Sequence, residues 1–259
     1  MKRLAAVVLW LLVILKITCS QTRADFYGIT EKNGTYLPDT IILFDEDSVR
    51  VNVIDLIDKP TVLSFVYFEC PGFCSPLMEG LAELIDNSDI QLGTHYQVFT
   101  ISIDDRETPS LAYSKKNSCL HSMIKSSEAA ESWKFFTGDA DNIQRITNAA
   151  GWRFKRNEDG FIHAVAVILV TPDRMISQYL YGTFFMPMHF QMAVSDAWKG
   201  LSVPARIKTL KYCYDYASKT NRNVRAVALS FGIFIILAVT GIFLKLSLDT
   251  QVRDNESKN

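Results

Sequence analysis

The sequence has little net charge, few cysteines and no repeats or low-complexity tracts. Its 27 lysines and arginines nearly balance its 28 aspartates and glutamates, and no long basic block occurs. Because nucleic-acid binding requires such a block, we expect no nucleic-acid partner. The 5 cysteines are an odd number at wide spacings, which matches no small disulfide scaffold. The middle of the chain therefore has to fold around an apolar core.

Charge is absent from a short stretch near the amino terminus. Residues 4–15 are apolar, follow two basic residues and precede a small polar segment. This is the pattern of a secretory signal peptide, too short to span a bilayer comfortably. We expect residues 1–24 to be a signal peptide, with an uncleaved anchor as the alternative. Lipidation of Cys19 is a further alternative, although Lys16 and Thr18 fit it poorly.

A second uncharged stretch lies near the carboxyl terminus. Residues 226–244 contain no charged side chain, and nineteen helical residues reach about the 30 Å of a hydrocarbon core. This predicts a transmembrane helix followed by a short cytoplasmic tail at residues 245–259. An exported amino terminus places residues 25–218 outside the cytoplasm, on the periplasmic side of the inner membrane in a Gram-negative cell.

The apolar pattern between these ends predicts an α/β fold. Residues 61–68 and 98–103 are almost continuously apolar, as in strands buried on both faces. Apolar residues at helical spacing follow each of these strands. A helix that connects two neighbouring strands of a sheet makes those strands parallel, so we expect the central strands to be parallel. The order is that of a thioredoxin-like sandwich with a central mixed sheet. Further strands are expected at residues 40–44, 49–54, 162–170 and 175–181, and helices at residues 77–85, from Thr108 and at residues 139–150.

Cys70 and Cys74 lie where the first central strand gives way to a helix. In open α/β sheets, binding and catalytic residues lie at the carboxyl ends of the strands. A four-residue spacing on one helical turn brings both sulfurs to one face, and amide groups at a helix start favour thiolates. A structural disulfide does not explain this exposed location. Electron exchange and metal binding remain as alternatives, and both require thiolates.

Two thiolates and an imidazole would suit copper, so the histidines are candidate ligands. His95 and His121 lie in polar surroundings, where we expect them to be exposed, and His189 lies in a methionine-rich segment. His163 stands near the start of an apolar strand, where a lone histidine is by default a core residue. The residues alone do not choose between a metal site and a redox pair.

Met186 and Met188 lie directly before His189. Thioether sulfur is a soft donor with the right chemistry for Cu(I). Methionine also fills apolar gaps, and we favour that second interpretation of this segment, as a loop packing toward the domain or the lipid.

Four segments, taken together, resemble the Sco/SenC family in order and spacing. They are YFECPGFC at residues 67–74, ISIDDRETP at 101–109, WKFFTG at 133–138 and GFIH at 160–163. The resemblance spans roughly residues 37–181 and implies a thioredoxin-like, membrane-tethered copper protein. It also implies that Cys70, Cys74 and His163 are the copper ligands, holding Cu(I) or Cu(II).

The function implied by the resemblance is that of a copper metallochaperone, an assembly factor and not an enzyme. Its partner would be the copper-binding subunit of cytochrome c oxidase, whose dinuclear copper site it helps to assemble, or another exported cuproprotein. The alternative is a thiol-disulfide oxidoreductase in which Cys70 and Cys74 reduce the cysteines of an exported partner. A peroxidase is disfavoured because Tyr67 occupies the place of the usual threonine or serine.

Two features depart from the family pattern. Ile162 precedes the histidine where the family has an aspartate, and the clear membrane segment lies at the carboxyl terminus. The sequence assigns no role to Cys119 or Cys213, and it leaves the oligomeric state open.

Overall fold

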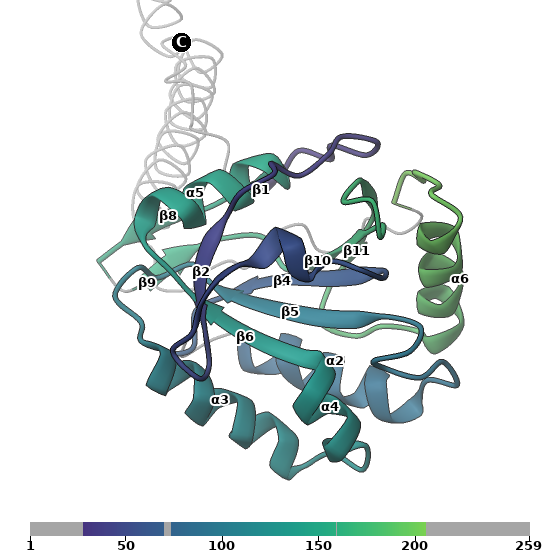
Figure 1. Ribbon diagram of the computed structural model, residues 1–259, viewed down its shortest axis with the longest axis horizontal. Helices are drawn as coiled ribbons and strands as arrows, with labels where there is room; N and C mark the ends of the chain where they lie inside the picture. The colour runs from purple at the N-terminus through teal and green to yellow at the C-terminus, as the bar shows by residue number, and fades with distance from the viewer. Residues whose placement is uncertain (1–27, 70–73, 159, 206–259) are drawn as a thin grey trace, which may run out of the picture. The chain divides into compact units, whose positions relative to one another are not determined.

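Seven strands form a mixed sheet at the centre of the chain (Figure 1). The computed structural model describes residues 28–69, 74–158 and 160–205, with the backbone alone at residues 74 and 75. The expected signal peptide, transmembrane helix and tail fall outside these ranges. Within these ranges, no helix is long and apolar enough to cross a membrane. Also outside them are Cys19, Cys70 and Cys213.

The centre of the sheet is parallel and its two margins are antiparallel. The order is β11-β10-β4-β5-β6-β2-β3, with β4, β5 and β6 parallel to one another. Every residue of β4 and β5 is buried, as their continuous apolar sequences predict. The strands are β2 (Ile42–Asp45), β3 (Arg50–Asn52), β4 (Thr61–Val66), β5 (Gln97–Ser102), β6 (Trp133–Thr137), β10 (Ala166–Val170) and β11 (Ile176–Tyr181).

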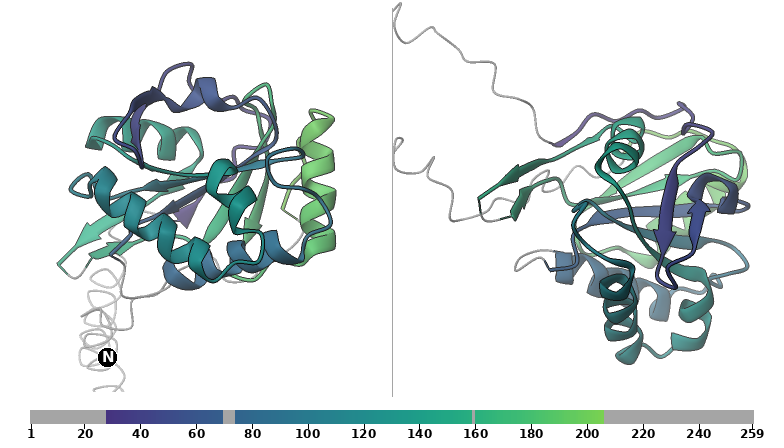
Figure 2. Two further views of the ribbon diagram at one scale, coloured as in Figure 1. Left: turned by 60° about the horizontal axis from the view of Figure 1, so that its bottom comes forward. Right: turned by 60° about the vertical axis from the view of Figure 1, so that its left-hand side comes forward.

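Helices cover both faces of this sheet (Figures 1 and 2). Helices α2 and α3 follow β4 and β5 and lie on one face, because two right-handed crossovers in the same direction place both helices on one side. Helix α5 lies on the other face, and α6 packs against β10 and β11 at the edge. The helices are α2 (Cys74–Asn87), α3 (Pro109–His121), α4 (Ser126–Ser132), α5 (Ala140–Ala149) and α6 (Pro187–Trp198), with a 3-10 turn η1 (Val53–Leu56).

Helix boundaries follow the capping signals in the sequence. The Thr108 hydroxyl accepts a hydrogen bond from the Leu111 amide at 3.4 Å, and Pro109 is the first residue of α3. The Asp139 carboxylate likewise caps α5 through the Asn142 amide at 2.8 Å. Gly151, which closes that helix, has a φ of 63°, a left-handed conformation that favours glycine.

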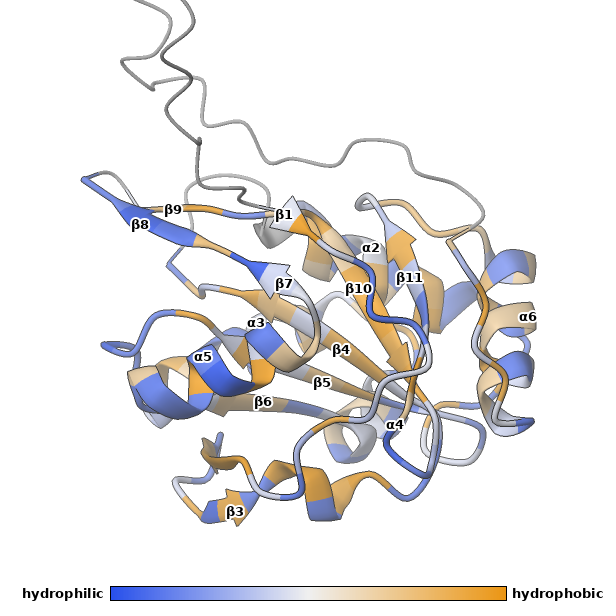
Figure 3. Cartoon of the chain, turned by 90° about the horizontal axis from the view of Figure 1, so that it is seen from above, coloured by the Kyte–Doolittle hydropathy of each residue, from blue (hydrophilic) through white to orange (hydrophobic). Residues whose placement is uncertain are grey.

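Two small antiparallel pairs extend the fold beyond the main sheet. Strand β1 (Gly28–Ile29) pairs with β7 (Trp152–Arg153), and β8 (Lys155–Asn157) pairs with β9 (Gly160–Ile162). The β8–β9 hairpin projects from the body (Figure 2, right). Figure 3 shows β8 as hydrophilic, whereas β10 and β11 are largely hydrophobic. The β8 side of the hairpin faces solvent, whereas Phe161 of β9 is buried and belongs to the apolar core, which lies on both faces of the main sheet.

The structure corrects three expectations drawn from the sequence. The predicted strand at residues 162–170 is broken, because β9 pairs with β8 whereas β10 pairs with β4 and β11. Strand β6, in which Lys134 separates Trp133 from two consecutive phenylalanines, was not predicted, and neither were the helices α4 and α6. The long strand expected at residues 49–54 ends at Asn52, where η1 begins.

Candidate metal centre

The predicted ligands belong to segments at the carboxyl end of β4. Cys74 is the first residue of α2, and His163 lies in the connection between β9 and β10. Cys70 lies outside the described residues, and the side chain of Cys74 is not described. Among the described side chains, no group of three histidine, cysteine, aspartate or glutamate residues is arranged to hold a metal. The geometry therefore defines one predicted ligand and the surroundings of the other two.

The ring of His163 is buried, with 2% of the residue exposed. Its Nδ1 atom lies 2.8 Å from the carbonyl oxygen of Ala164. Because a carbonyl oxygen only accepts, Nδ1 is the donor in this contact. An imidazole with one ring nitrogen bonded to a backbone carbonyl is the arrangement typical of a metal-ligating histidine. The residue present therefore fits a role as a ligand.

Aromatic rings surround the imidazole. The ring of Trp152 lies 5.3 Å from that of His163 at an interplanar angle of 36°, and the ring of Tyr67 lies 6.1 Å away, edge-on at 85°. Trp152 is fully buried, and its indole N–H has no hydrogen-bond partner among the described residues. Packing of this kind holds the imidazole in one orientation and excludes water from it. Tyr67 lies three residues before Cys70, so the same packing links the histidine to the cysteine segment.

Gly160 allows the hairpin to approach the end of β4. Its φ is 139°, and a β-carbon placed there would lie 2.7 Å from the hydroxyl oxygen of Tyr67. Any other residue would push Tyr67 away and strain the backbone. The β9 strand that leads to His163 is thus seated directly on the strand that leads to Cys70.

Glu107 binds the backbone immediately before Cys70. Its carboxylate accepts hydrogen bonds from the Phe68 amide at 2.7 and 2.9 Å, from the Glu69 amide at 3.0 Å and from the Ser102 hydroxyl at 2.5 Å. Burial raises the pKa of Glu107 above its ordinary value, against these hydrogen bonds, which favour the ionised form. The carboxylate fixes the last two residues of the approach to the cysteines.

A charged cluster lies beside Glu107. Asp104 is nearly buried, with Arg106 Nη2 at 2.6 Å and Arg156 Nη2 at 2.9 Å. Burial disfavours the ionised form of Asp104, but the hydrogen bonds from Arg106 and the charge of Arg156 outweigh it and lower its pKa. Arg156 also pairs with Asp105 and lies 4.8 Å from the ring centre of Phe161. These contacts fasten the β8–β9 hairpin to the loop after β5.

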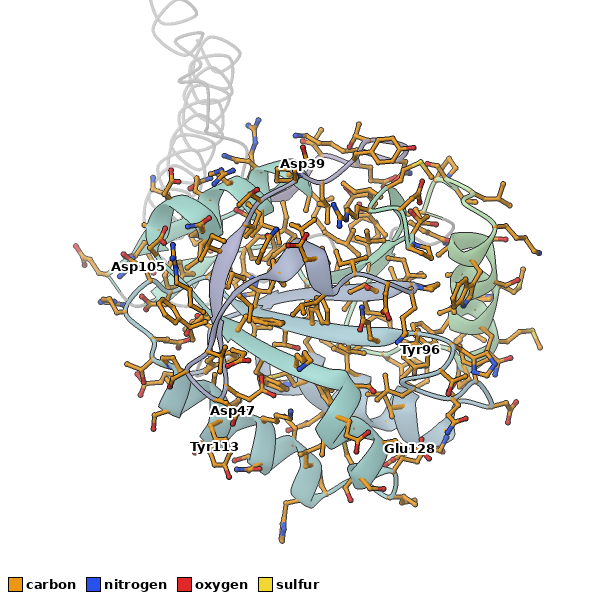
Figure 4. The ribbon with its side chains drawn as sticks, viewed as in Figure 1. Asp39, Asp47, Tyr96, Asp105, Tyr113 and Glu128 are labelled. Carbon is orange, nitrogen blue, oxygen red and sulfur yellow. The ribbon has the colours of Figure 1, made fainter. Side chains whose placement is uncertain are left out.

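The other histidines lie away from His163. His95 is exposed, and its ring nitrogen accepts the Gln91 amide at 3.1 Å in the loop before β5. Asp105 and Tyr96 mark the two ends of β5, on opposite sides of the molecule (Figure 4). His121 is exposed in the last turn of α3, and His189 is half-buried in α6. The expectation that His95 and His121 are exposed is confirmed.

Cys119 carries a free, half-buried thiol in α3. Burial raises the pKa of Cys119 to about 11, so the thiol stays protonated at neutral pH. It lines a cavity of about 150 Å³ between α2 and α3, together with Met78, Glu79 and Lys115. A protonated thiol in this setting is a packed residue and not an activated nucleophile.

Sequence reasoning missed three residues of this region, namely Glu107, Trp152 and Arg156. Glu107 lies inside the segment ISIDDRETP at residues 101–109, but nothing in its spacing shows that its side chain reaches the backbone before Cys70. Trp152 and Arg156 are 82 or more positions away from Cys70. Only strand pairing places them, β7 with β1 and β8 with β9. No sequence signal connects a residue to such a distant partner.

The parallel centre of the sheet, its two crossovers and Cys74 at the start of the helix after β4 define a thioredoxin-like α/β protein. The family model described as SCO1/SenC matches residues 39–184, more than half of the chain. The chain belongs to the SCO1/SenC family. Among curated proteins, none matches the sequence.

Solved structures share the fold. A protein of Aquifex aeolicus VF5 is 23% identical with a TM-score of 0.58, covering 65% of this chain and 95% of its own. ScoI of Arabidopsis thaliana, solved with copper bound, is 20% identical with a TM-score of 0.50, covering 64% and 98%. BsSco, a Sco-family cytochrome c oxidase assembly protein with a disulfide switch, is 18% identical with a TM-score of 0.50, covering 66% and 96%. At these identities the likeness establishes the fold.

Proposed function

We propose that this chain is a copper metallochaperone that binds copper through Cys70, Cys74 and His163. It delivers the metal to the dinuclear copper site of cytochrome c oxidase and assists the assembly of that site. The observation that carries the proposal is the state of His163, a buried imidazole whose Nδ1 donates to Ala164 at 2.8 Å. A backbone carbonyl on one ring nitrogen is the arrangement usual for metal-ligating histidines, and it supports His163 as a ligand.

The donor set supports copper as the cargo. Two thiolates and one imidazole suit Cu(I) and thiolate-bound Cu(II), because both prefer sulfur and nitrogen to oxygen. Cys74 begins α2, where amide N–H groups favour the thiolate form. A structure of another member of the fold class, ScoI of Arabidopsis thaliana, contains copper. The chemistry of the donor atoms and the similarity to a copper-containing structure therefore support the proposal independently.

The residues around the ligands prepare the site for metal transfer. Glu107 holds the amides of Phe68 and Glu69, so the cysteine segment begins from a fixed point. Trp152 and Tyr67 keep the imidazole of His163 oriented. Transfer then consists of ligand exchange, in which cysteines of the recipient replace those of the chaperone one at a time. Ile162 directly precedes His163, so this position supplies no carboxylate to the step.

Membrane attachment belongs to the same proposal. Residues 1–24 direct export, residues 25–218 form the copper-binding domain outside the cytoplasm, and residues 226–244 span the membrane. The tail at residues 245–259 remains in the cytoplasm. A tether restricts the search for a recipient in the same membrane to two dimensions and raises its effective concentration.

An anaerobic copper titration of the full-length chain in detergent tests the ligand assignment. We expect a thiolate-to-copper absorption band that grows to one equivalent in the wild type. Cys70→Ser and Cys74→Ser should abolish the band, and His163→Ala should lower copper affinity by about 10-fold or more, the range seen when metal-site residues are changed. His95→Ala is the matched control, since that ring lies in the loop before β5.

Absence of any thiolate band at one equivalent in the wild type would exclude the chaperone function. Equal affinity in the wild type and His163→Ala would remove His163 from the ligand set. Copper affinity lost equally in His95→Ala would show that the effect is not specific to the site.

A thiol-disulfide oxidoreductase is the second candidate, favoured by the position of Cys74 at the first residue of α2. In that reaction one thiolate attacks a partner disulfide, the other resolves the mixed disulfide, and two electrons pass to the partner. This activity requires both cysteines and no imidazole. Disulfide reduction by the metal-free chain that survives His163→Ala would therefore support it.

A further inference from the structure

Helix α6 and the residue before it present methionine side chains to solvent. Met186, Met188 and Met192 are 51%, 69% and 42% exposed, and they are three of the 7 methionines in the chain. Methionine is among the residues most often buried, and exposed thioethers are prone to oxidation. The interpretation favoured from the sequence was packing toward the domain or the lipid, and packing toward the domain does not account for this exposure.

The inner face of α6 is built from other residues. Phe190, Ala193, Val194 and Ala197 are buried at helical spacing and dock the helix on the domain. Met188 and Met192 are one turn apart on the outward side. Residues at this separation have β-carbons about 5–6 Å apart, so two long thioether side chains can reach one ion.

His189 connects the methionines into one group. It is three residues after Met186, the N-cap of α6, and three residues before Met192. Side chains three or four positions apart on a helix are neighbours. Each of these side chains is therefore next to another across the first two turns. We call this set the methionine cluster: Met186, Met188, His189 and Met192.

We propose that the methionine cluster is a second Cu(I) site. Thioethers and imidazole are uncharged donors, and thioether sulfur selects Cu(I) over oxygen-preferring cations such as Mg²⁺ and Ca²⁺. None of its four members is a carboxylate, and Asp196 lies one turn beyond Met192. The long, flexible methionine side chains allow the low coordination numbers and adaptable geometry of a soft ion.

The cluster is separate from the proposed centre of Cys70, Cys74 and His163. Phe190 of α6 packs edge-on against Tyr96 with 4.9 Å between the ring centres. Tyr96 precedes β5, whereas Glu107 binds the approach to Cys70 beyond the other end of that strand. A six-residue strand extends about 20 Å. The segment before α6 starts nearer to His163, because the Gly182 amide donates to the Val165 carbonyl at 3.0 Å. Met188 and Met192 lie on α6 itself, and with these donors the full chain should carry two Cu(I) ions.

The test is the stoichiometry of Cu(I) binding to the full-length chain in detergent. An anaerobic titration against a chromophoric Cu(I) chelator measures the number of equivalents withheld from the competitor. We expect two equivalents for the wild type and one for Met188→Leu/Met192→Leu. Leucine preserves the apolar volume and removes the sulfur, so a loss reports ligation and not packing.

A chain carrying Cys70→Ser, Cys74→Ser and His163→Ala should still retain one equivalent, which the two leucine substitutions then remove. This arm separates the cluster from the proposed function: loss of the first equivalent alone leaves the cluster supported. Two controls should keep both equivalents. Met175→Leu removes a sulfur outside the cluster, and Phe184→Ser removes an exposed apolar side chain next to it without changing a donor.

A single equivalent in the wild type, lost entirely with the cysteine and histidine substitutions, overturns the methionine site. Two equivalents that persist in Met188→Leu/Met192→Leu overturn it as well. If the leucine variant unfolds, which circular dichroism would reveal, single substitutions at Met188 and at Met192 give the same comparison, each expected to weaken the second equivalent.

Discussion

Two glutamates serve the fold in opposite ways. Glu46 is buried and forms an ion pair with Lys116, and its other oxygen accepts the Phe135 amide at 3.0 Å. Glu107 accepts hydrogen bonds from two backbone amides and a hydroxyl, with no lysine or arginine among these partners. Lys116 also donates to the Ala130 carbonyl at 2.6 Å, so the Glu46 pair joins α3 to α4 and β6.

The difference shows what each carboxylate stabilises. A cation beside Glu46 neutralises a charge that would otherwise be buried alone, and the pair is part of the interior. Glu107 instead uses its charge to hold the last backbone amides before Cys70. We therefore expect changes at Lys116 to affect stability, and changes at Glu107 to affect the site as well.

The largest effect should come from Lys116→Met, which leaves the Glu46 carboxylate buried without its cation. Breaking a buried pair on one side costs about 3–5 kcal/mol of unfolding free energy. Urea denaturation followed by tryptophan fluorescence measures this loss. Adding Glu46→Gln should recover part of it, since the unpaired charge is then gone. Copper affinity of the folded variant should equal that of the wild type, and a weakened site would contradict the assignment.

A smaller stability effect, with a change in the site, is expected for Glu107→Gln. The carboxamide has one acceptor oxygen, and its NH₂ group faces the amides that the carboxylate now accepts. Leaving a partly buried donor unpaired costs about 1–3 kcal/mol. Copper affinity should fall by about 10-fold, the lower end of the effect of residues that support ligands. Unchanged affinity in a titration, alongside the expected loss of stability, would restrict Glu107 to a structural role.

The smallest effect concerns pH, where Asp104 and Glu107 should behave oppositely. The lowered pKa of Asp104 stabilises the fold above its unfolded value of about 3.9, and this is lost as pH falls through the folded pKa. The raised pKa of Glu107 stabilises the fold below about 4.3, and this is lost as pH rises through the folded pKa.

Asp104→Asn should therefore cost about 1 kcal/mol near neutral pH, with the difference from the wild type shrinking in acid. The difference for Glu107→Gln should widen in acid. Unfolding free energies measured in steps from about pH 3 to pH 7 give both slopes. Slopes of the same sign for the two variants would show that one of the two pKa shifts has the wrong direction.

Local signals predicted the elements that depend on local physics. The apolar runs of β4 and β5, the threonine and aspartate caps of α3 and α5, and Gly151 at the end of α5 lie where the sequence placed them. The mixed sheet also followed from the order of elements. In contrast, β6 and α6 were missed. Strand β6 is short and contains a lysine, and the methionines on the exposed side of α6 obscure the helical spacing of its buried residues.

The sequence by itself determined the family and the order of strands and helices around β4, and it predicts Cys70, Cys74 and His163 as ligands. Its local patterns suffice for these, since strand burial, helix starts and motif spacing are properties of neighbouring residues. Only the tertiary structure decided that His163 is buried between Trp152 and Tyr67 and that Glu107 holds the backbone before Cys70. These contacts join segments that are distant along the chain, and they depend on sheet pairing, which no local pattern specifies.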